Sequence, residues 1–153
     1  MPQSAVLDGT MHKTHEWLNA IGDELGSRND RSALAALRAT LHAVRDRLTI
    51  DEMAQFGAQL PILIRGLYYE GWNPTSDLLR KSHDADFLDA MRRELKGHDE
   101  LQDAGRAAKI VLKVVSQKMS SDEVDQAIHG LPRQVRELWE EARRPPPPES
   151  GKA

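Results

Sequence analysis

The sequence is poor in the residues that usually carry chemistry. It contains no cysteine, and Phe, Trp and Tyr together make up 5% of its 153 residues. Without cysteine the chain has no disulfide, no thiolate nucleophile and no cysteine-ligated zinc site. Its longest apolar stretch, residues 60–67, is interrupted by Pro61, Arg65 and Gly66 and is far shorter than the ~20 residues of a membrane-spanning helix. The first 13 residues lack the apolar run of a signal peptide, so the sequence predicts a cytoplasmic protein with no membrane segment.

The sequence also lacks the short motifs of common active sites. It has no GxSxG, GxGxxG, P-loop or HExxH pattern. The adjacent carboxylates of Asp51 and Glu52 point in different directions on a helix, so they do not converge as an acid–base pair does. We therefore predict no catalytic residue, no metal site and no cofactor, which favours a protein that is not an enzyme. The net charge of -3 argues mildly against non-specific binding to duplex nucleic acid.

The sequence is rich in helical patterns. Apolar residues recur at steps of three and four over residues 15–25 and 30–48, with Thr14 as the expected N-cap of the first helix and Gly26 as its end. Thr49 and Glu52 form a capping box that opens a third helix over 51–59. Pro61 fits the start of a fourth helix over 61–70.

The same pattern then returns further along the chain. Residues 33–72 align with 104–143 at a constant offset of 71, and 12 of the 40 pairs are identical. The identities include helix caps, the helix-starting proline and core positions, so the repeat is structural. The sequence therefore predicts an all-α fold, an eight-helix bundle built from two tandem four-helix repeats.

The composition also predicts how the chain is divided. We expect a flexible N-terminal tail over 1–13, a first repeat over 14–74, a linker over 75–82 and a second repeat over 83–143. The repeats are expected to share one core over 14–143, because a four-helix unit of about 60 residues is marginal alone. The four prolines that begin at Pro145 cannot join a bundle, so residues 144–153 are predicted to be a disordered tail.

Several segments are similar to a known family. LRATLHAVRDRLTIDE and QLPILIRGLYYEGW in the first repeat, THEWL at Thr14–Leu18 and LPRQVRELW at Leu131–Trp139 carry the likeness. The chain resembles the bacterial domain-of-unknown-function family 2267 over about residues 12–142. The resemblance implies a helical bacterial protein, and it implies no activity, cofactor or catalytic residue.

The clearest difference between the repeats lies in their fourth helices. Residues 61–70 are apolar nearly all round, whereas the matching segment after Pro132 is amphipathic. A helix that is apolar on every face must be buried or covered. It is either packed between the repeats or exposed as an aromatic patch for another protein or a second copy. The candidate partner-binding residues are Leu63, Tyr68, Tyr69 and Trp72.

Basic residues on two helices suggest a further function. Arg31, Arg38 and Arg45 recur every seven residues, and Lys109 and Lys113 lie on the matching helix. These five residues are candidates for binding an anion such as a nucleic acid, unless acidic neighbours neutralise them. His42, which aligns with Lys113, is predicted to be solvated. A small-molecule pocket between the repeats, with or without enzyme activity, is the remaining alternative.

Overall fold

The computed structural model describes residues 2–27, 29–73 and 86–144. Over these residues the chain is all-α, with eight α-helices, one short 3-10 helix and no strand, as the sequence predicted. The predicted linker over 75–82 and the proline tail from residue 145 lie outside the described residues. The helices are α1 (Pro2–Leu25), α2 (Asp30–Arg45), α3 (Ile50–Ala58), α4 (Ile62–Tyr69), α6 (Asp86–Glu94), α7 (Ala104–Lys118), α8 (Ser121–His129) and α9 (Arg133–Arg143), with η1 (Asp99–Leu101) before α7.

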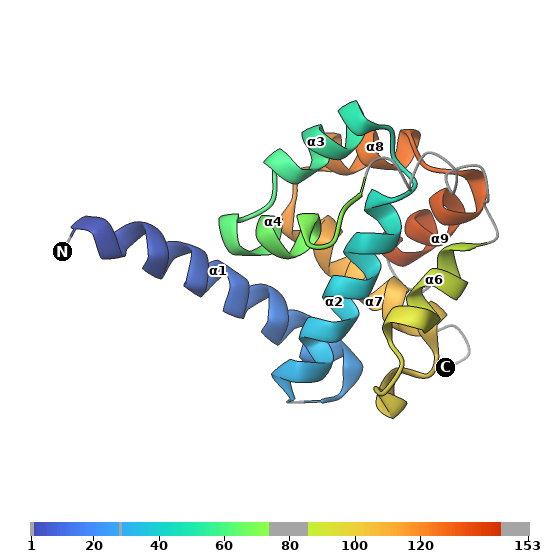
Figure 1. Ribbon diagram of the computed structural model, residues 1–153, viewed down its shortest axis with the longest axis horizontal. Coiled ribbons are helices and arrows are strands. Elements are labelled where there is room, and N and C mark those ends of the chain that lie inside the picture. The colour runs from blue at the N-terminus through green and yellow to red at the C-terminus, as the bar shows by residue number, and fades with distance from the viewer. Residues whose placement is uncertain (1, 28, 74–85, 145–153) are drawn as a thin grey trace, which may run out of the picture.

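Helices α2 and α7 form the centre of the fold (Figure 1). They pack against each other, and both α1 and α6 contact the pair. Small side chains face the centre, since Ala36, Ala39, Ala107 and Ala108 are all buried, and this lets the two helices approach closely. Helix α4 covers α2, α9 covers α7, and α3 lies beside α8.

Two capping boxes and a C-terminal glycine begin and end helices at the positions predicted from the sequence. Thr49 and Ser120 each form a complete capping box, with Glu52 and Glu123 respectively. Both boxes satisfy backbone N–H groups that a helix start leaves without partners. Gly26 has a φ of +75° and follows the last residue of α1, as a C-terminal glycine does. These signals involve only residues a few positions apart, which is why the sequence was enough to predict them.

The beginning of α1 differs from the sequence prediction. Residues 2–13, predicted as a flexible tail, are helical, and Thr14 lies within the helix instead of capping it. The buried Thr14 hydroxyl donates to the carbonyl of Thr10, four residues earlier, at 2.7 Å. No proline follows Pro2 in this stretch, so nothing stops the helix from continuing. We call residues 2–13 the arm, because they project from the body of the molecule (Figure 1).

Candidate interaction surface

Helix α4 is held at its N-terminus by the arm. Pro61 occupies the N-cap position and provides no side-chain cap. The hydroxyl of Thr10, on α1, instead accepts a hydrogen bond from the backbone N–H of Leu63 at 3.0 Å. A group 53 positions away in sequence thus satisfies one of the free N–H groups of α4.

The carboxyl end of α4 is held by α2. The guanidinium of Arg45 donates to the carbonyls of Tyr68 and Glu70, at 2.9 and 2.7 Å, and to the carboxylate of Asp46. Arg38 forms an ion pair with the Glu70 carboxylate at 2.9 Å. Positive groups at a helix C-terminus satisfy its free carbonyls and interact favourably with the helix dipole.

His42 belongs to the same contact. The prediction that its side chain is solvated is therefore wrong. Its Nε2 lies 2.7 Å from the carbonyl of Leu67, and its Nδ1 lies 2.9 Å from the Glu94 carboxylate on α6. The two ring nitrogens thus face oxygen atoms on two different helices, α4 and α6. Three side chains of α2, at positions 38, 42 and 45, therefore fix the end of α4.

The other predicted anion-binding residues are dispersed. Lys109 pairs with Glu141, and Lys113 pairs with Glu24 at 2.9 Å. Arg31 is exposed at the start of α2, where its backbone N–H is capped by Asn29. Arg38, Arg45, Lys109 and Lys113 thus all bind oxygen atoms of the chain itself, and Arg45 is buried.

The aromatic residues form a chain of ring contacts from the core to the surface. The centroid of the Phe56 ring lies 6.1 Å from that of Trp139, which it meets edge-on, and 5.6 Å from that of Tyr68. The centroid of the Tyr69 ring lies 5.0 Å from that of Tyr68 and 6.2 Å from that of Trp72. Contacts of this kind contribute about 0.5–1.5 kcal/mol each beyond burial. The chain joins α3 and α4 to α9, and it ends at Trp72.

Only part of the predicted aromatic patch is therefore at the surface. Tyr68 is fully buried, and its hydroxyl donates to the carbonyl of Met53 at 2.9 Å. Burial raises the pKa of the Tyr68 hydroxyl well above its usual range, and the neighbouring Tyr69 raises it further. Tyr69 and Trp72 are half-buried, and Leu63 is exposed.

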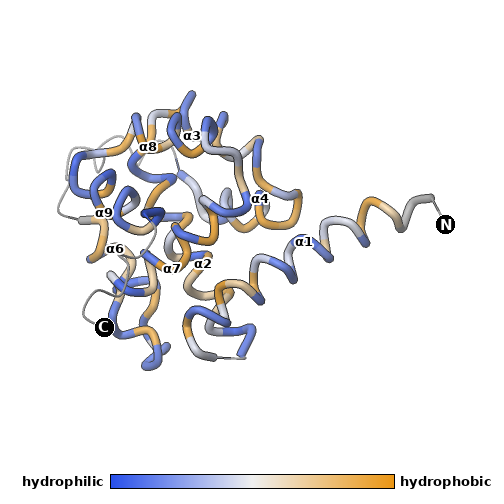
Figure 2. Tube along the Cα trace, turned by 180° about the vertical axis from the view of Figure 1, so that it is seen from behind, coloured by the Kyte–Doolittle hydropathy of each residue, from blue (hydrophilic) through white to orange (hydrophobic). Residues whose placement is uncertain are grey.

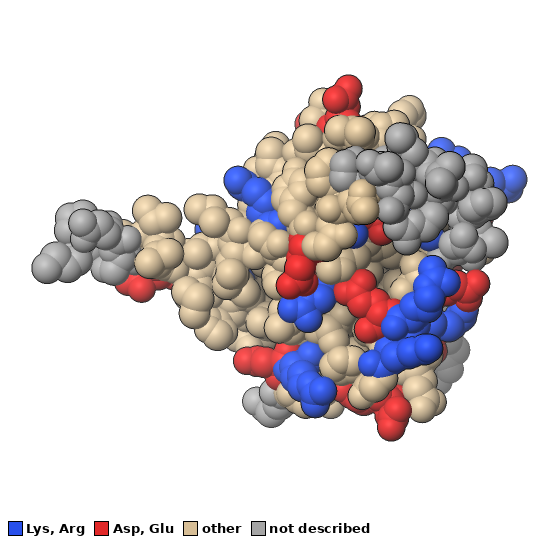
Figure 3. Space-filling view, in the orientation of Figure 1, with Lys and Arg blue, Asp and Glu red and all other residues tan. Residues whose placement is uncertain are grey.

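The exposed apolar side chains gather on the arm and the outer face of α4. Figure 2 shows hydrophobic stretches on both segments, interrupted by hydrophilic residues along the arm, and in Figure 3 the arm and the adjoining surface carry few charges. Gly66 lies on the same outer face and has open space around its α-carbon. We call this the α1–α4 surface; it consists of Val6 (61% exposed), Leu7 (65%), Met11 (48%), Ile62 (57%) and Leu63 (41%).

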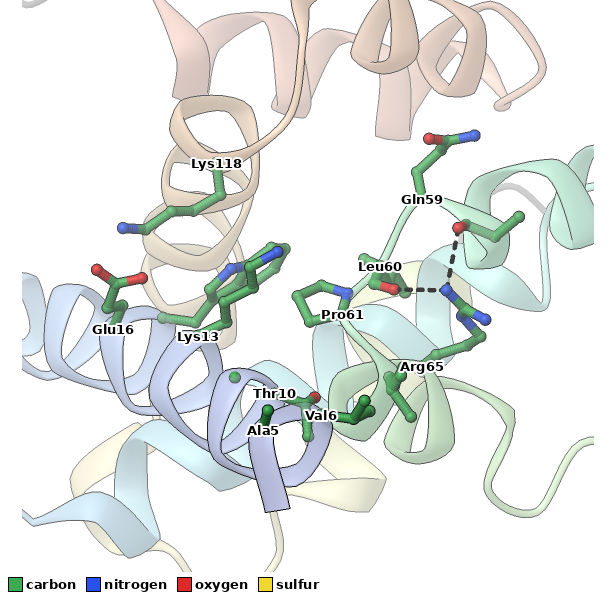
Figure 4. Close-up of a pocket in the computed structure, with 14 residues that line it drawn as sticks. Ala5, Val6, Thr10, Lys13, Glu16, Gln59, Leu60, Pro61, Arg65 and Lys118 are labelled. Atoms are coloured by element: carbon green, nitrogen blue, oxygen red, sulfur yellow. Dashed lines mark hydrogen bonds between the residues drawn. The ribbon is translucent and has the colours of Figure 1, made fainter. Parts of the chain in front are cut away.

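A groove of about 540 Å³ runs beside this surface, between α1, the α3–α4 connection and the end of α7 (Figure 4). Trp17, Leu60 and Pro61 contribute apolar lining. The guanidinium of Arg65 donates to the carbonyls of Ala58 and Leu60, at 3.1 and 3.0 Å. The charged side chains that line the groove are Lys13, Arg65, Lys118 and Glu16, three cations and one carboxylate.

Comparison with known families identifies the chain. The model of the family described as uncharacterized conserved protein (DUF2267) matches residues 14–148. The chain belongs to this family. No curated protein matches it. The match includes α4 and the groove residues from Glu16 onward, whereas the arm precedes it.

The described residues of this DUF2267 member hold neither a candidate metal site nor a membrane-spanning helix. Residues 2–27, 29–73 and 86–144 contain no group of three His, Asp or Glu side chains placed to hold a metal ion. Within the same ranges, no helix combines the length and apolar character needed to cross a bilayer.

The contribution of α1 to the surface is not among the predictions from the sequence. Val6, Leu7 and Met11 were assigned to a tail, so their apolar side chains were not considered. A signal was present, because Leu7 and Met11 continue the spacing of Leu18 and Ile21 along one face of the helix. Extending the periodicity search towards the N-terminus finds it.

Proposed function

We propose that this protein is a non-enzymatic interaction module that binds a partner protein through the α1–α4 surface. The observation that supports this most directly is the outer face of α4. Both ends of the helix are fixed, by Thr10 and by Arg45, yet its outer side chains Ile62 and Leu63 are exposed. Large exposed apolar side chains in a contiguous patch are typical of interaction sites.

The corresponding positions on α9 strengthen the proposal. Ile62, Leu63, Gly66 and Tyr69 align at the offset of 71 with Arg133, Gln134, Glu137 and Glu140. The first three of those α9 residues are exposed, and Glu140 is half-buried. The fold therefore accepts polar and charged residues at these positions, and stability alone does not require apolar ones on α4.

The groove adds a requirement on the partner. Its three cations are not matched by its one carboxylate, and no ion pair joins Lys13, Arg65 or Lys118 to an acidic group within the described residues. We expect the partner to bring apolar side chains to the α1–α4 surface and a carboxylate near the groove.

Two other functions have less support. For a polyanion binder, most of the predicted basic residues are already engaged with acidic groups or carbonyls of the chain. For a small-molecule site between the repeats, the groove by α1 is the best candidate, but four of the side chains that line it are charged, whereas ligand pockets are mostly apolar.

The test of the proposed function compares three immobilised baits in lysate of the source cells: wild type, Leu63→Glu and Gln134→Glu. Gln134 is the matched control, because it occupies the aligned exposed position on α9. We expect the wild type and the control to retain the same specific protein, identified by mass spectrometry, and Leu63→Glu to lose it. All three baits must have the same thermal midpoint. Identical retained proteins for all three would contradict the proposal.

A further inference from the structure

The groove beside α1 is lined by an aromatic side chain whose polar atom has no partner. Trp17 is 4% exposed and lines the groove. Its indole N–H donates to no acceptor within the described part of the chain, and its nitrogen is open to solvent. Comparable groups in the core are satisfied, since the Trp139 indole donates to Ser116 and the Tyr68 hydroxyl donates to a backbone carbonyl. A largely buried indole N–H usually has an acceptor, so Trp17 leaves a donor for a bound molecule.

The matching segment at the start of α6 shows that packing does not require this donor. Trp17 and Ile21 share their spacing with Phe87 and Met91, at an offset of 70, and all four side chains are buried. Phe87 thus fills the corresponding position with a ring that has no polar atom. An N–H without an acceptor opposes burial, because it loses its hydrogen bonds to water. The indole of Trp17 therefore points to a ligand that accepts its hydrogen bond.

Two lysines bring uncompensated positive charge to the same groove. Lys13 from α1 and Lys118 from the end of α7 lie on one side of it, and Arg65 lies on the other (Figure 4). Neither lysine has an ion pair or a side-chain hydrogen bond with the described residues. Glu16 is on the same side, and its carboxylate lies 3.5 Å from His12. Two ammonium groups and one carboxylate leave one positive charge in excess there, which matches the charge of one further carboxylate.

We infer that the groove binds an acidic side chain of the partner protein, held by the indole N–H of Trp17 and the ammonium groups of Lys13 and Lys118. The inference rests on the proposed function and names the chemistry of its partner. All three groups are donors, and a carboxylate has two oxygen atoms that accept several hydrogen bonds. Bonds between ammonium groups and carboxylates are stronger than neutral ones, so the site discriminates against the uncharged amides of Asn and Gln.

The borders of the groove select a segment of a protein as the source of this carboxylate. Val6 and Ile62 line the groove and also belong to the α1–α4 surface, where they are 61% and 57% exposed. A small organic acid in the groove leaves both apolar side chains in water. A protein segment with an apolar residue close to its Asp or Glu covers them at the same time. The partner segment is therefore expected to combine an acidic and an apolar side chain within a few positions.

The first experiment selects random peptides displayed on phage against three baits of the full chain. They are the wild type, the groove variant Lys13→Gln/Lys118→Gln and the control Lys109→Gln/Lys113→Gln, which removes the same charge from lysines paired with acidic groups elsewhere. The wild type and the control are expected to enrich peptides with Asp or Glu beside an apolar residue, and the groove variant is not. A wild type that enriches no acidic peptides, or a groove variant that enriches the same ones, overturns the inference.

The second experiment observes the indole N–H groups by nuclear magnetic resonance while the most enriched peptide is added to the labelled full chain. The chain has three tryptophans, and Trp17→Phe identifies the resonance of Trp17. The peptide is expected to shift this resonance and to leave that of Trp139, which is already bonded to Ser116, in place. The same peptide with its acidic residue replaced by the amide binds at least about tenfold more weakly. A Trp17 resonance that stays in place at saturation overturns the inference.

Affinity measurements then separate binding from folding. Trp17→Phe keeps a buried ring, as Phe87 does, but removes the N–H, and it raises the dissociation constant of the acidic peptide about three- to tenfold. Lys118→Gln changes an exposed position that leaves the fold intact, and it raises the constant by a similar factor. An unchanged constant for both variants contradicts the assigned site.

The outcomes separate this inference from the proposed function. If acidic peptides are not enriched but Leu63→Glu still loses a protein from the lysate, the carboxylate site is wrong and the interaction module stands. If acidic peptides bind as expected but the lysate baits retain identical proteins, the proposed function is wrong and the carboxylate site stands. Failure of both experiments overturns both.

Discussion

The contacts of α4 with α2 and of α9 with α7 are made at the same aligned positions but with different chemistry. Arg38 pairs with Glu70, and at the offset of 71 Lys109 pairs with Glu141. Seven residues after Arg38 the two regions diverge, because Arg45 aligns with Ser116. Arg45 donates to carbonyls of α4, whereas Ser116 accepts a hydrogen bond from the Trp139 indole at 2.9 Å. The two ion pairs lie at aligned positions, and the organisation of the fold as two tandem four-helix repeats stays a prediction.

The difference explains how α4 can present an apolar outer face. Its backbone is fixed at the carboxyl end by a buried guanidinium and a histidine, and these contacts do not use its outer side chains. Helix α9 is fixed instead through a side chain, Trp139, and by the ion pair of Arg143 with Asp125 on α8. The outer face of α4 is thus free to serve binding, and that of α9 carries charge.

The largest expected effect comes from Arg45. Arg45→Met keeps an unbranched apolar stem but removes the guanidinium, which leaves the carbonyls of Tyr68 and Glu70 without their donor. We expect a loss of about 3 kcal/mol in the free energy of unfolding, measured by urea denaturation. Ser116→Ala, at the aligned position, should cost only about 1 kcal/mol. Equal losses at the two positions would contradict the proposed difference between the regions.

A smaller effect is expected at the glycine against which the α4 rings pack. A Cβ at Gly57 would lie 2.9 Å from both the Tyr68 ring and the Tyr69 hydroxyl, and at the aligned position the second region has Ile128. Gly57→Ala should therefore lower the thermal midpoint, at a cost of about 1–2 kcal/mol. Gly66→Ala is the matched control on α4, where a Cβ meets nothing within 4 Å. That control should stabilise the protein by about 0.5–1 kcal/mol through helix propensity, so the two changes have opposite signs.

The smallest effect is expected where the two regions agree. Glu70→Gln and Glu141→Gln each remove one ion pair between exposed or half-exposed side chains. Lys109 lowers the pKa of the Glu141 carboxyl, chiefly through its hydrogen bond. Exposed pairs contribute little because water and salt screen them, so each change should alter stability by less than about 1 kcal/mol. A much larger loss for one of them in the same urea titration would show that the two pairs are not equivalent.

The candidate surface was only partly predictable from the sequence. Leu63 was expected at an exposed patch and is exposed, but Tyr68 was grouped with it and is buried. Adjacent residues on a helix point to different sides, and which side faces the core depends on the neighbouring helices. The basic residues of α2 were predicted to bind an external anion. Instead Arg45 donates to backbone carbonyls at the carboxyl end of α4, and Arg38 pairs with the Glu70 carboxylate.

Apart from the start of α1, the sequence by itself determined the helices, their caps and their boundaries within a few residues, because capping boxes, prolines and apolar periodicity act over short distances. It also determined that the fold is all-α and that residues 33–72 and 104–143 share one pattern. Only the tertiary structure decided that Arg45 binds α4, that His42 joins α4 to α6 and that the arm is a projecting helix. These contacts join residues far apart in the chain, and their partners follow from how whole helices pack, which no local pattern specifies.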